Sequence, residues 1–305
     1  MITLPLQASS PPWTGIGEWG ALLSAVCWGI STVLYAGRFR QGGSPWDAVL
    51  TKNLLATLIL GVLAWVIPAG WGGAAPGPGE LGWLLVSGAL GFALGDLLFF
   101  NAIALLGVGR ATVLALLSVL FAALLAWTLE GEALTPTQWM GCSLVLGGAS
   151  VVELRRGRGH LGSRGVVFAL SCSFIWAIAG FLARKGLAET GPLTAAAIRI
   201  GGGTVALLLW AGLRGRALPV LRRMARPESW RPFLLPAFVG TVCGVSFLCV
   251  GLKWAKLGVA MSLANAYPAF ALPLAAWWLR EKIPARVWFA AATVLSGAVL
   301  LRVAA

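Results

Sequence analysis

The chain has 305 residues, of which 59% are hydrophobic and only 11% are charged, and its mean hydropathy is +0.86. A soluble domain carries about 25% charged residues, so this composition excludes an ordinary soluble protein. The net charge of +13 does not indicate nucleic-acid binding, because the basic residues lie at the ends of apolar runs, as the positive-inside rule describes. The composition predicts an all-α integral membrane protein that contacts a lipid bilayer.

The apolar runs predict ten transmembrane helices, because each run is near the ~20 residues that cross a bilayer. A backbone in hydrocarbon must also satisfy its own hydrogen bonds, which favours helices. The first five spans are Gly17–Ala36, Ala48–Pro68, Leu81–Leu106, Ala111–Leu129 and Thr137–Val152. The second five are Gly165–Ala183, Leu193–Leu213, Phe233–Trp254, Gly258–Leu279 and Ala285–Val303. Residues 1–17 have no basic segment, so we expect no cleaved signal peptide.

The stretch Gly91–Glu132 recurs, without a gap, at Gly240–Glu281. Matched positions include Gly91 with Gly240, Gly95 with Gly244, Gly109 with Gly258, Glu132 with Glu281 and Trp139 with Trp288. A duplicated hydrophobic chain is typical of transporters. We predict a tail over 1–16, a five-helix repeat over 17–155, a basic linker over 156–164 and a second five-helix repeat over 165–305. Because five is odd, the two repeats would be inverted in the membrane.

Lys and Arg residues predict the orientation of the chain. The connections after odd-numbered spans hold Arg38, Arg40, Lys52, Arg110, Arg155, Arg156, Arg158, Arg164, Arg214, Arg216, Arg222, Arg223, Arg226, Arg231, Arg280, Lys282 and Arg286. The opposite side holds Arg184, Lys185, Arg199, Lys253, Lys256 and Arg302. The bias predicts that both termini are non-cytoplasmic in an inner or plasma membrane. Lys52 and Arg199 are interpreted as anchors near the ends of corresponding spans, free to snorkel or to pair with acids.

Asp96 lies near the middle of the third span. A charged residue at a helix centre costs about 2.5–3.5 kcal/mol on insertion scales, so an acid there indicates function. It could bind a proton, a sodium ion or a substrate amine. The alternative is a neutral carboxyl group that bonds to a neighbouring helix. The matching residue of the second repeat is Val245, so the role of Asp96 is asymmetric.

A polar and aromatic stripe follows one face of the first span. Its residues are Ser24, Trp28, Ser31, Thr32 and Tyr35. The sixth span, its counterpart, places Ser173, Trp176 and Gly180 on one face. Such faces suit a substrate cavity for a small amphipathic or cationic ligand. The alternative is that both tryptophans only pack between helices.

The ninth span, MSLANAYPAFALP, contains Pro268 and Pro273, which remove backbone donors and predict a kink or hinge. Asn265 and Tyr267 precede the kink, where they could meet a ligand or satisfy freed backbone groups. The fourth span has no proline at the matching place. Any hinge is therefore expected mainly in the second repeat.

The Gly91–Gly95 pair and its copy form G-x-x-x-G patterns, which allow close helix packing. On an ideal α-helix the glycine face points more than a quarter-turn from Asp96, so the two are expected to face different neighbours. The five cysteines fall inside apolar runs and are interpreted as small core residues. Glu132 and Glu281 are expected to satisfy nearby backbone or basic groups at helix ends.

The residues that enzymes and ATP-driven proteins need are not found together. The single histidine, His160, lies in a basic connection, and no His, Asp, Glu or Cys cluster has metal-ligand spacing. No Gly-rich phosphate loop ends in Lys followed by Ser or Thr. We expect no cofactor, no metal, no catalytic residue and no coupling to ATP within this chain.

Two segments then resemble a known repeat. GVGRATVLALLSVLFAALLAWTLEGEALTPTQWMGCSLVLGGASVV and LGVAMSLANAYPAFALPLAAWWLREKIPARVWFAAATVLSGAVLL are similar to the repeat of the drug/metabolite transporter superfamily, in its EamA-like ten-helix branch. The resemblance covers about Glu18–Val303 and implies export of small metabolites from a cavity lined by spans 1, 3, 4, 6, 8 and 9. Many relatives have a basic loop between spans 2 and 3 and cytoplasmic termini, whereas 69–79 has no charge here.

Together these features favour a secondary transporter that exports an amino acid, a nucleobase or an amphipathic compound by alternating access. Asp96 is the candidate site for coupling to a proton or sodium ion. The alternatives are an uncoupled facilitator or channel-like pore and, less favoured, a membrane enzyme or lipid-handling protein.

Overall fold

A computed structural model of the chain describes residues 15–67, 75–130, 135–153, 160–215, 222, 226–255 and 257–303. Among these residues, seven helices are long and apolar enough to cross a membrane. They span Ile16–Arg40, Pro45–Val66, Pro78–Leu106, Val108–Leu129, Ser163–Gly186, Pro192–Leu213 and Pro227–Trp254. The protein is therefore an all-helical, multi-pass membrane protein.

The elements follow the order of the predicted spans. The first half contains α1 (Ile16–Arg40), α2 (Pro45–Val66), α3 (Pro78–Gly88), η1 (Ala89–Gly95), α4 (Asp96–Leu106), α5 (Val108–Ala115), α6 (Leu117–Glu130) and α7 (Pro136–Glu153). The second half contains α8 (His160–Gly186), α9 (Pro192–Leu213), α11 (Pro227–Ala237), η2 (Phe238–Cys243), α12 (Gly244–Trp254), α13 (Leu257–Ala264), α14 (Pro268–Trp278) and α15 (Ala285–Val303). The end of the predicted linker, residues 160–164, is thus helical, and most of the predicted tail lies outside the described residues.

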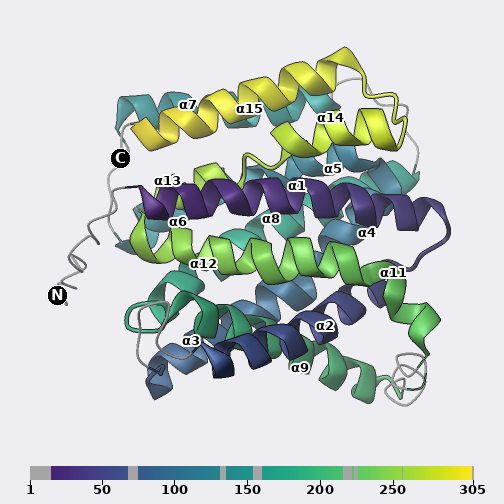
Figure 1. The fold of residues 1–305 in the computed structure, drawn as a ribbon. Coiled ribbons are helices and arrows are strands. Elements are labelled where there is room, and N and C mark those ends of the chain that lie inside the picture. Colours follow the sequence, from purple (N-terminus) through teal and green to yellow (C-terminus); the bar gives the residue numbers. More distant parts are fainter. Residues whose placement is uncertain are drawn as a thin grey trace.

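The helices pack side by side in one bundle (Figure 1). α1 and α12 lie side by side through its middle, α7 pairs with α15 along one edge, and α2, α3 and α9 pack together at the other. The start of α1 and the end of α15 lie at the same end of the bundle (Figure 1). This arrangement places segments from both halves of the chain around a common centre.

α2 and α9 are equivalent elements of the duplication. Each has 22 residues and begins with proline, whose fixed φ angle and missing N–H suit the first helical position. Aligning the two helices end to end pairs Lys52 with Arg199 and Thr57 with Thr204. The hydroxyls of the two threonines lie 2.7 Å apart, so the two helices meet at matching positions.

Both halves also contain a π-helical segment at the same place. η1 begins at Ala89 and η2 at Phe238, and each continues without a break into the following α-helix. A π-helix bonds i to i+5 and is rare, and it occurs often at functional sites. The duplicated Gly91 and Gly240 lie inside these two segments.

α3 and α9 approach each other closely because both present glycine. A Cβ atom on Gly88 would overlap the backbone carbonyl of Arg199, and one on Gly202 would lie 2.7 Å from the carbonyl oxygen of Leu85. This contact brings the Oγ of Ser87 within 3.0 Å of the Nε of Arg199. The glycines therefore fix the position of a buried cation.

Glu281 holds two connections together, as the sequence predicts. Its Oε2 lies 3.0 Å from Nη2 of Arg40, and its Oε1 accepts a hydrogen bond from the N–H of Gly109. Its counterpart Glu132 lies outside the described residues.

Candidate functional site

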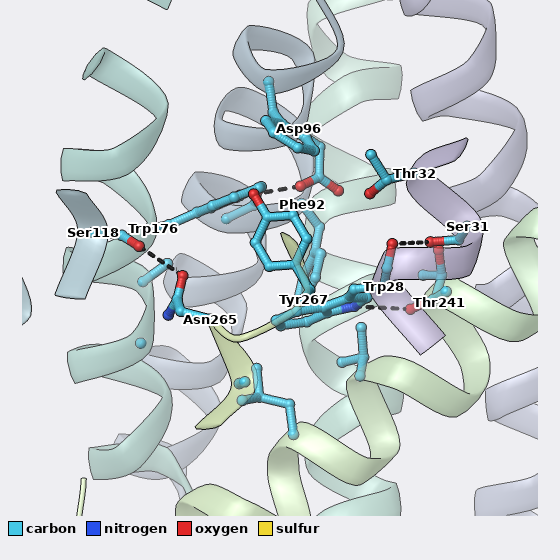
Figure 2. Close-up of a pocket in the computed structure, with 18 of the residues that line it drawn as sticks. Trp28, Ser31, Thr32, Phe92, Asp96, Ser118, Trp176, Thr241, Asn265 and Tyr267 are labelled. Atoms are coloured by element: carbon cyan, nitrogen blue, oxygen red, sulfur yellow. Dashed lines mark hydrogen bonds between the residues drawn. The ribbon is translucent and has the colours of Figure 1, made fainter. Parts of the chain in front are cut away.

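A central cavity with a volume of about 100 Å³ lies between the two halves of the bundle. Eight residues that the sequence proposes for a substrate cavity line it: Trp28, Ser31, Thr32, Tyr35, Asp96, Trp176, Asn265 and Tyr267. Ser24 and Ser173, from the same two helix faces, do not. They come from α1, α4, α8 and the turn between α13 and α14 (Figure 2). Lys52 and Arg199 also line the cavity, from α2 and α9.

Asp96 forms a buried ion pair with Lys52. The Nζ of Lys52 lies 2.6 Å from the Oδ2 of Asp96, and the two side chains are 4% and 11% exposed. Lys52 also donates to the Oδ1 of Asn53, whose Nδ2 donates to the carbonyl of Phe92 in η1. The indole Nε1 of Trp176 donates to the other carboxylate oxygen of Asp96 at 3.3 Å (Figure 2). The carboxyl group of Asp96, on α4, is thus held by contacts from α2 and α8.

Arg199 is a second buried cation on the cavity wall, and 3% of it is exposed. Its Nε donates to the Oγ of Ser87, and its Nη1 lies 3.7 Å from the sulfur of Cys249. The guanidinium also lies 4.9 Å from the ring centre of Phe92, a cation–π contact. Among the described residues, no carboxylate lies within ion-pair distance of Arg199. The wall therefore holds two cations and one anion.

The interpretation of Lys52 and Arg199 as snorkelling anchors is wrong, whereas the alternative of pairing with an acid is confirmed for Lys52. Both side chains are buried and point to the cavity. The sequence could have indicated this, because both lie inside apolar spans and match each other in the duplication, as functional intramembrane charges do. Neither residue belongs in the count that sets orientation. Each side of that count loses one charge, so the bias keeps its direction.

The two cavity tryptophans make the same contact in opposite halves. The Nε1 of Trp28 donates to the carbonyl of Gly240 at 3.0 Å, and that of Trp176 donates to the carbonyl of Gly91 at 3.3 Å. Each tryptophan thus reaches from one repeat to the π-helical glycine of the other. A π-helical segment changes the backbone pairing of an α-helix, and each indole adds a hydrogen bond to one of these carbonyls, as at Gly91, which also accepts from the backbone N–H of Asp96.

The duplicated glycines are packing positions, as predicted. A Cβ atom on Gly95 would lie 2.7 Å from the Nε1 of Trp176, and one on Gly244 would lie 2.8 Å from that of Trp28. The prediction that Asp96 faces away from this glycine face is wrong, because Trp176 contacts both. η1 bonds the backbone N–H of Asp96 to the carbonyl of Gly91, so Asp96 lies closer to the face of Gly91 than it would in an α-helix.

Two broken helices meet beside the cavity. In the second half, α13 ends at Ala264 and α14 begins at Pro268. Asn265, in the gap, donates from Nδ2 to the carbonyl of Met261 and accepts a hydrogen bond from the Oγ of Ser118 (Figure 2). Asn265 thus satisfies a backbone group and lines the cavity, the two possibilities that the sequence left open.

The first half is broken at the matching place. α5 ends at Ala115 and α6 begins at Leu117, although this segment contains no proline. The Oγ of Ser173 donates to the carbonyl of Leu114 there, which compensates for lost helical pairing. The helix is therefore interrupted in both halves, although the sequence predicts a hinge mainly in the second. Pro268 is the first residue of α14, and Pro273 lies inside that helix.

Aromatic rings form the apolar part of the wall. Phe99 lies 4.8 Å from Trp176, and Phe100 lies 4.7 Å from Tyr35, measured between ring centres. Tyr267 contacts Phe99 edge-on. The hydroxyl of Tyr35 is buried and has no hydrogen-bond partner among the described residues. The cavity thus combines an aromatic surface with a small set of charges, the composition of small-molecule sites.

No group of three or more His, Cys, Asp or Glu residues that could hold a metal ion occurs in the part of the chain that the structure describes. Cys172 and Cys249 are buried, in agreement with their predicted core role, whereas Cys27 and Cys243 are partly exposed.

Comparison with known proteins agrees with this architecture. A probable terminal-alkyne amino-acid exporter of Streptantibioticus cattleyicolor is 26% identical over 254 residues, which cover 81% of this chain and 82% of that protein. A solved crystal structure of a protein has a similar fold, with a TM-score of 0.65 at 17% identity over 93% of this chain and 95% of that one. The model of the EamA-like transporter family matches residues 15–154 and again 163–303. The chain belongs to the EamA-like transporter family, with two EamA repeats.

Proposed function

We propose that this protein is a secondary transporter that exports a small organic metabolite from the cell by alternating access. The main supporting observation is the buried cavity that both repeats line, with its aromatic wall and its charged groups. Family membership supports a transporter rather than an enzyme. The probable amino-acid exporter supports amino acids as the first substrates to test, ahead of nucleobases and other amphipathic compounds.

The two repeats, over 17–155 and 165–305, would be inverted five-helix units that move relative to each other, ten spans in all. The interrupted helices α5–α6 and α13–α14 support this motion, because both breaks lie at the cavity. Pro268 and Pro273 would serve as a hinge next to Asn265. Trp28 and Trp176 link the repeats through reciprocal hydrogen bonds, which must break or shift when the repeats move apart.

Asp96 is the proposed coupling group, and the ion pair favours a proton over sodium. The ammonium of Lys52 already lies 2.6 Å from the carboxylate, so a sodium ion there would meet a like charge. A proton, in contrast, can bind the carboxylate and release Lys52. Protonation would thus change the charge of the cavity, which is a direct way to connect substrate release with a proton gradient.

Counterflow in liposomes tests the proposed function. Purified protein in liposomes loaded with an unlabelled compound is expected to accumulate the same compound, labelled, from outside, because a carrier exchanges substrate without a driving force. The panel is amino acids, nucleobases and cationic amphiphiles. We expect saturable exchange of an amino acid.

Protein-free liposomes are the control, together with a valinomycin-driven flux assay of the same vesicles. A channel-like pore would give flux without saturation and without exchange, and that result would replace the carrier proposal. Absence of both from folded protein would favour a lipid-handling role.

The charge bias supports the proposal that both termini face away from the cytoplasm in the cell membrane. In a chain without its native cysteines, Gly77→Cys should react with an impermeant maleimide from outside intact cells, and Gln41→Cys only after lysis. Both positions are exposed ends of connections, and neither has a positive φ angle. The opposite labelling pattern would reverse the proposed orientation.

A further inference from the structure

The duplication is unequal at its charged positions. In the first repeat, Lys52 contacts Asn53 and Asp96. The matching residues of the second repeat are Arg199, Ile200 and Val245. The second repeat has therefore kept the cation and lacks both of its oxygen-bearing partners.

In the second repeat, the residue that matches Asp96 is Val245, and it lies next to the cavity. Val245 lines the cavity together with Arg199, as Asp96 does with Lys52. Arg199 contacts α12, the helix of Val245, through Cys249 one turn further along. A thiol is a weak acceptor, and it leaves the charge of the guanidinium without a counter-ion among the described residues.

A buried, uncompensated arginine within a membrane is costly, so such residues mark binding sites for charged ligands. A guanidinium has more N–H donors than its two contacts use, and its planar fork matches a carboxylate. The hydroxyl of Tyr35, buried on the same cavity and without a partner among the described residues, is a further group for a ligand.

We propose that Arg199 is the subsite for a carboxylate of the transported substrate, which occupies the position that Asp96 occupies beside Lys52 in the other repeat. The charge of the wall favours a monoanion, because Asp96 already neutralises Lys52 and leaves one positive charge. A carboxylate meets this requirement better than a phosphate dianion. The proposal rests on the proposed transport function and specifies the charged group of its substrate.

Binding to purified protein tests this subsite apart from transport. Isothermal titration calorimetry compares L-leucine, L-phenylalanine and L-propargylglycine with their amides, which lack only the negative charge, and with the aminophosphonic acid analogue of leucine. The wild type should bind at least one acid about tenfold or more tightly than its amide and than the phosphonate, as expected for a hydrogen-bonded charge.

Two independent variants then locate the carboxylate. Arg199→Gln should abolish the preference for acid over amide, a change in the ratio of two affinities that a purely structural role would not produce. Val245→Asp supplies an internal carboxylate to Arg199 and should likewise abolish binding of the acid. Gln41→Asp, which adds the same charge at an exposed turn outside the cavity, is the control and should retain that binding.

Equal affinity for acid and amide, tighter binding of the phosphonate, or an unchanged acid preference in Val245→Asp would each overturn the proposal. So would the absence of saturable binding of every acid in the panel. Counterflow of a nucleobase or an amine by the same protein would leave the transport function intact while it removed the carboxylate subsite.

Discussion

Replacing Asp96 by leucine while Lys52 is kept should lower the free energy of unfolding by about 3–5 kcal/mol, because one partner of a buried ion pair then remains charged and unpaired. The same loss is expected for Lys52→Met. The double variant Lys52→Met/Asp96→Leu should regain most of the stability, because it removes both buried charges together. Denaturant titration in mixed micelles, followed by circular dichroism, measures all four chains. If the losses of the single variants simply add in the double variant, the two groups do not interact in the folded protein.

The same pair should decide how transport is coupled. Asp96→Asn keeps the shape of the side chain and removes its proton-binding group, so counterflow should continue while accumulation driven by a pH gradient is lost. Gln41→Asn, at an exposed turn outside the cavity, is a suitable control and should behave as the wild type. Unchanged accumulation in Asp96→Asn would remove Asp96 from the coupling mechanism.

The sequence was sufficient to assemble much of the cavity wall. A polar stripe such as Trp28, Ser31 and Tyr35 is unfavourable toward lipid, so its helix has to turn that face inward. The same argument applies to Asp96. Each of these inferences needs the sequence of only one span. Helical periodicity shows which face of the span is polar, and a polar face is unfavourable toward lipid.

Features that depend on contacts between spans were harder to predict. Lys52 lies one helical turn or so inside its span, where a long basic side chain can reach water, and nothing in α2 itself reveals that Asp96 is its partner. An α-helical wheel does not include the π-helical turn at Gly91, so it gives the wrong direction for the side chain of Asp96. The break at Leu116 is maintained by tertiary contacts such as that of Ser173 rather than by proline.

The duplication itself is the better guide to these features. Aligning α2 with α9 places Lys52 opposite Arg199, and both lie inside apolar spans. Two matching charges that survive in a hydrophobic environment suggest a shared location, and the unequal partners suggest different tasks. The three consecutive glycines at 201–203 also indicate that α9 is approached closely by another backbone.

That close approach leads to the second large effect, at Gly88. Replacing Gly88 by alanine should reduce the free energy of unfolding by about 3 kcal/mol, at the upper end of the usual range for overpacking. The added Cβ atom would overlap the backbone of Arg199, and a backbone cannot rotate aside as a side chain can. α3 and α9 must then separate, which moves the Oγ of Ser87 away from the Nε of Arg199. Thermal unfolding in detergent measures the loss of stability, and titration with the carboxylate probes measures the displacement of Arg199.

Gly82→Ala is the matched control, because Gly82 lies in the same helix and a Cβ atom there would meet nothing within 4 Å. Alanine has the higher helix propensity, by about 1 kcal/mol, so this variant should be as stable as the wild type or slightly more so. Gly88→Ala should therefore differ from Gly82→Ala in sign, and not only in size. If both variants gained stability, the backbones of α3 and α9 would not be in contact at Gly88, and the fixed position of Arg199 would need another cause.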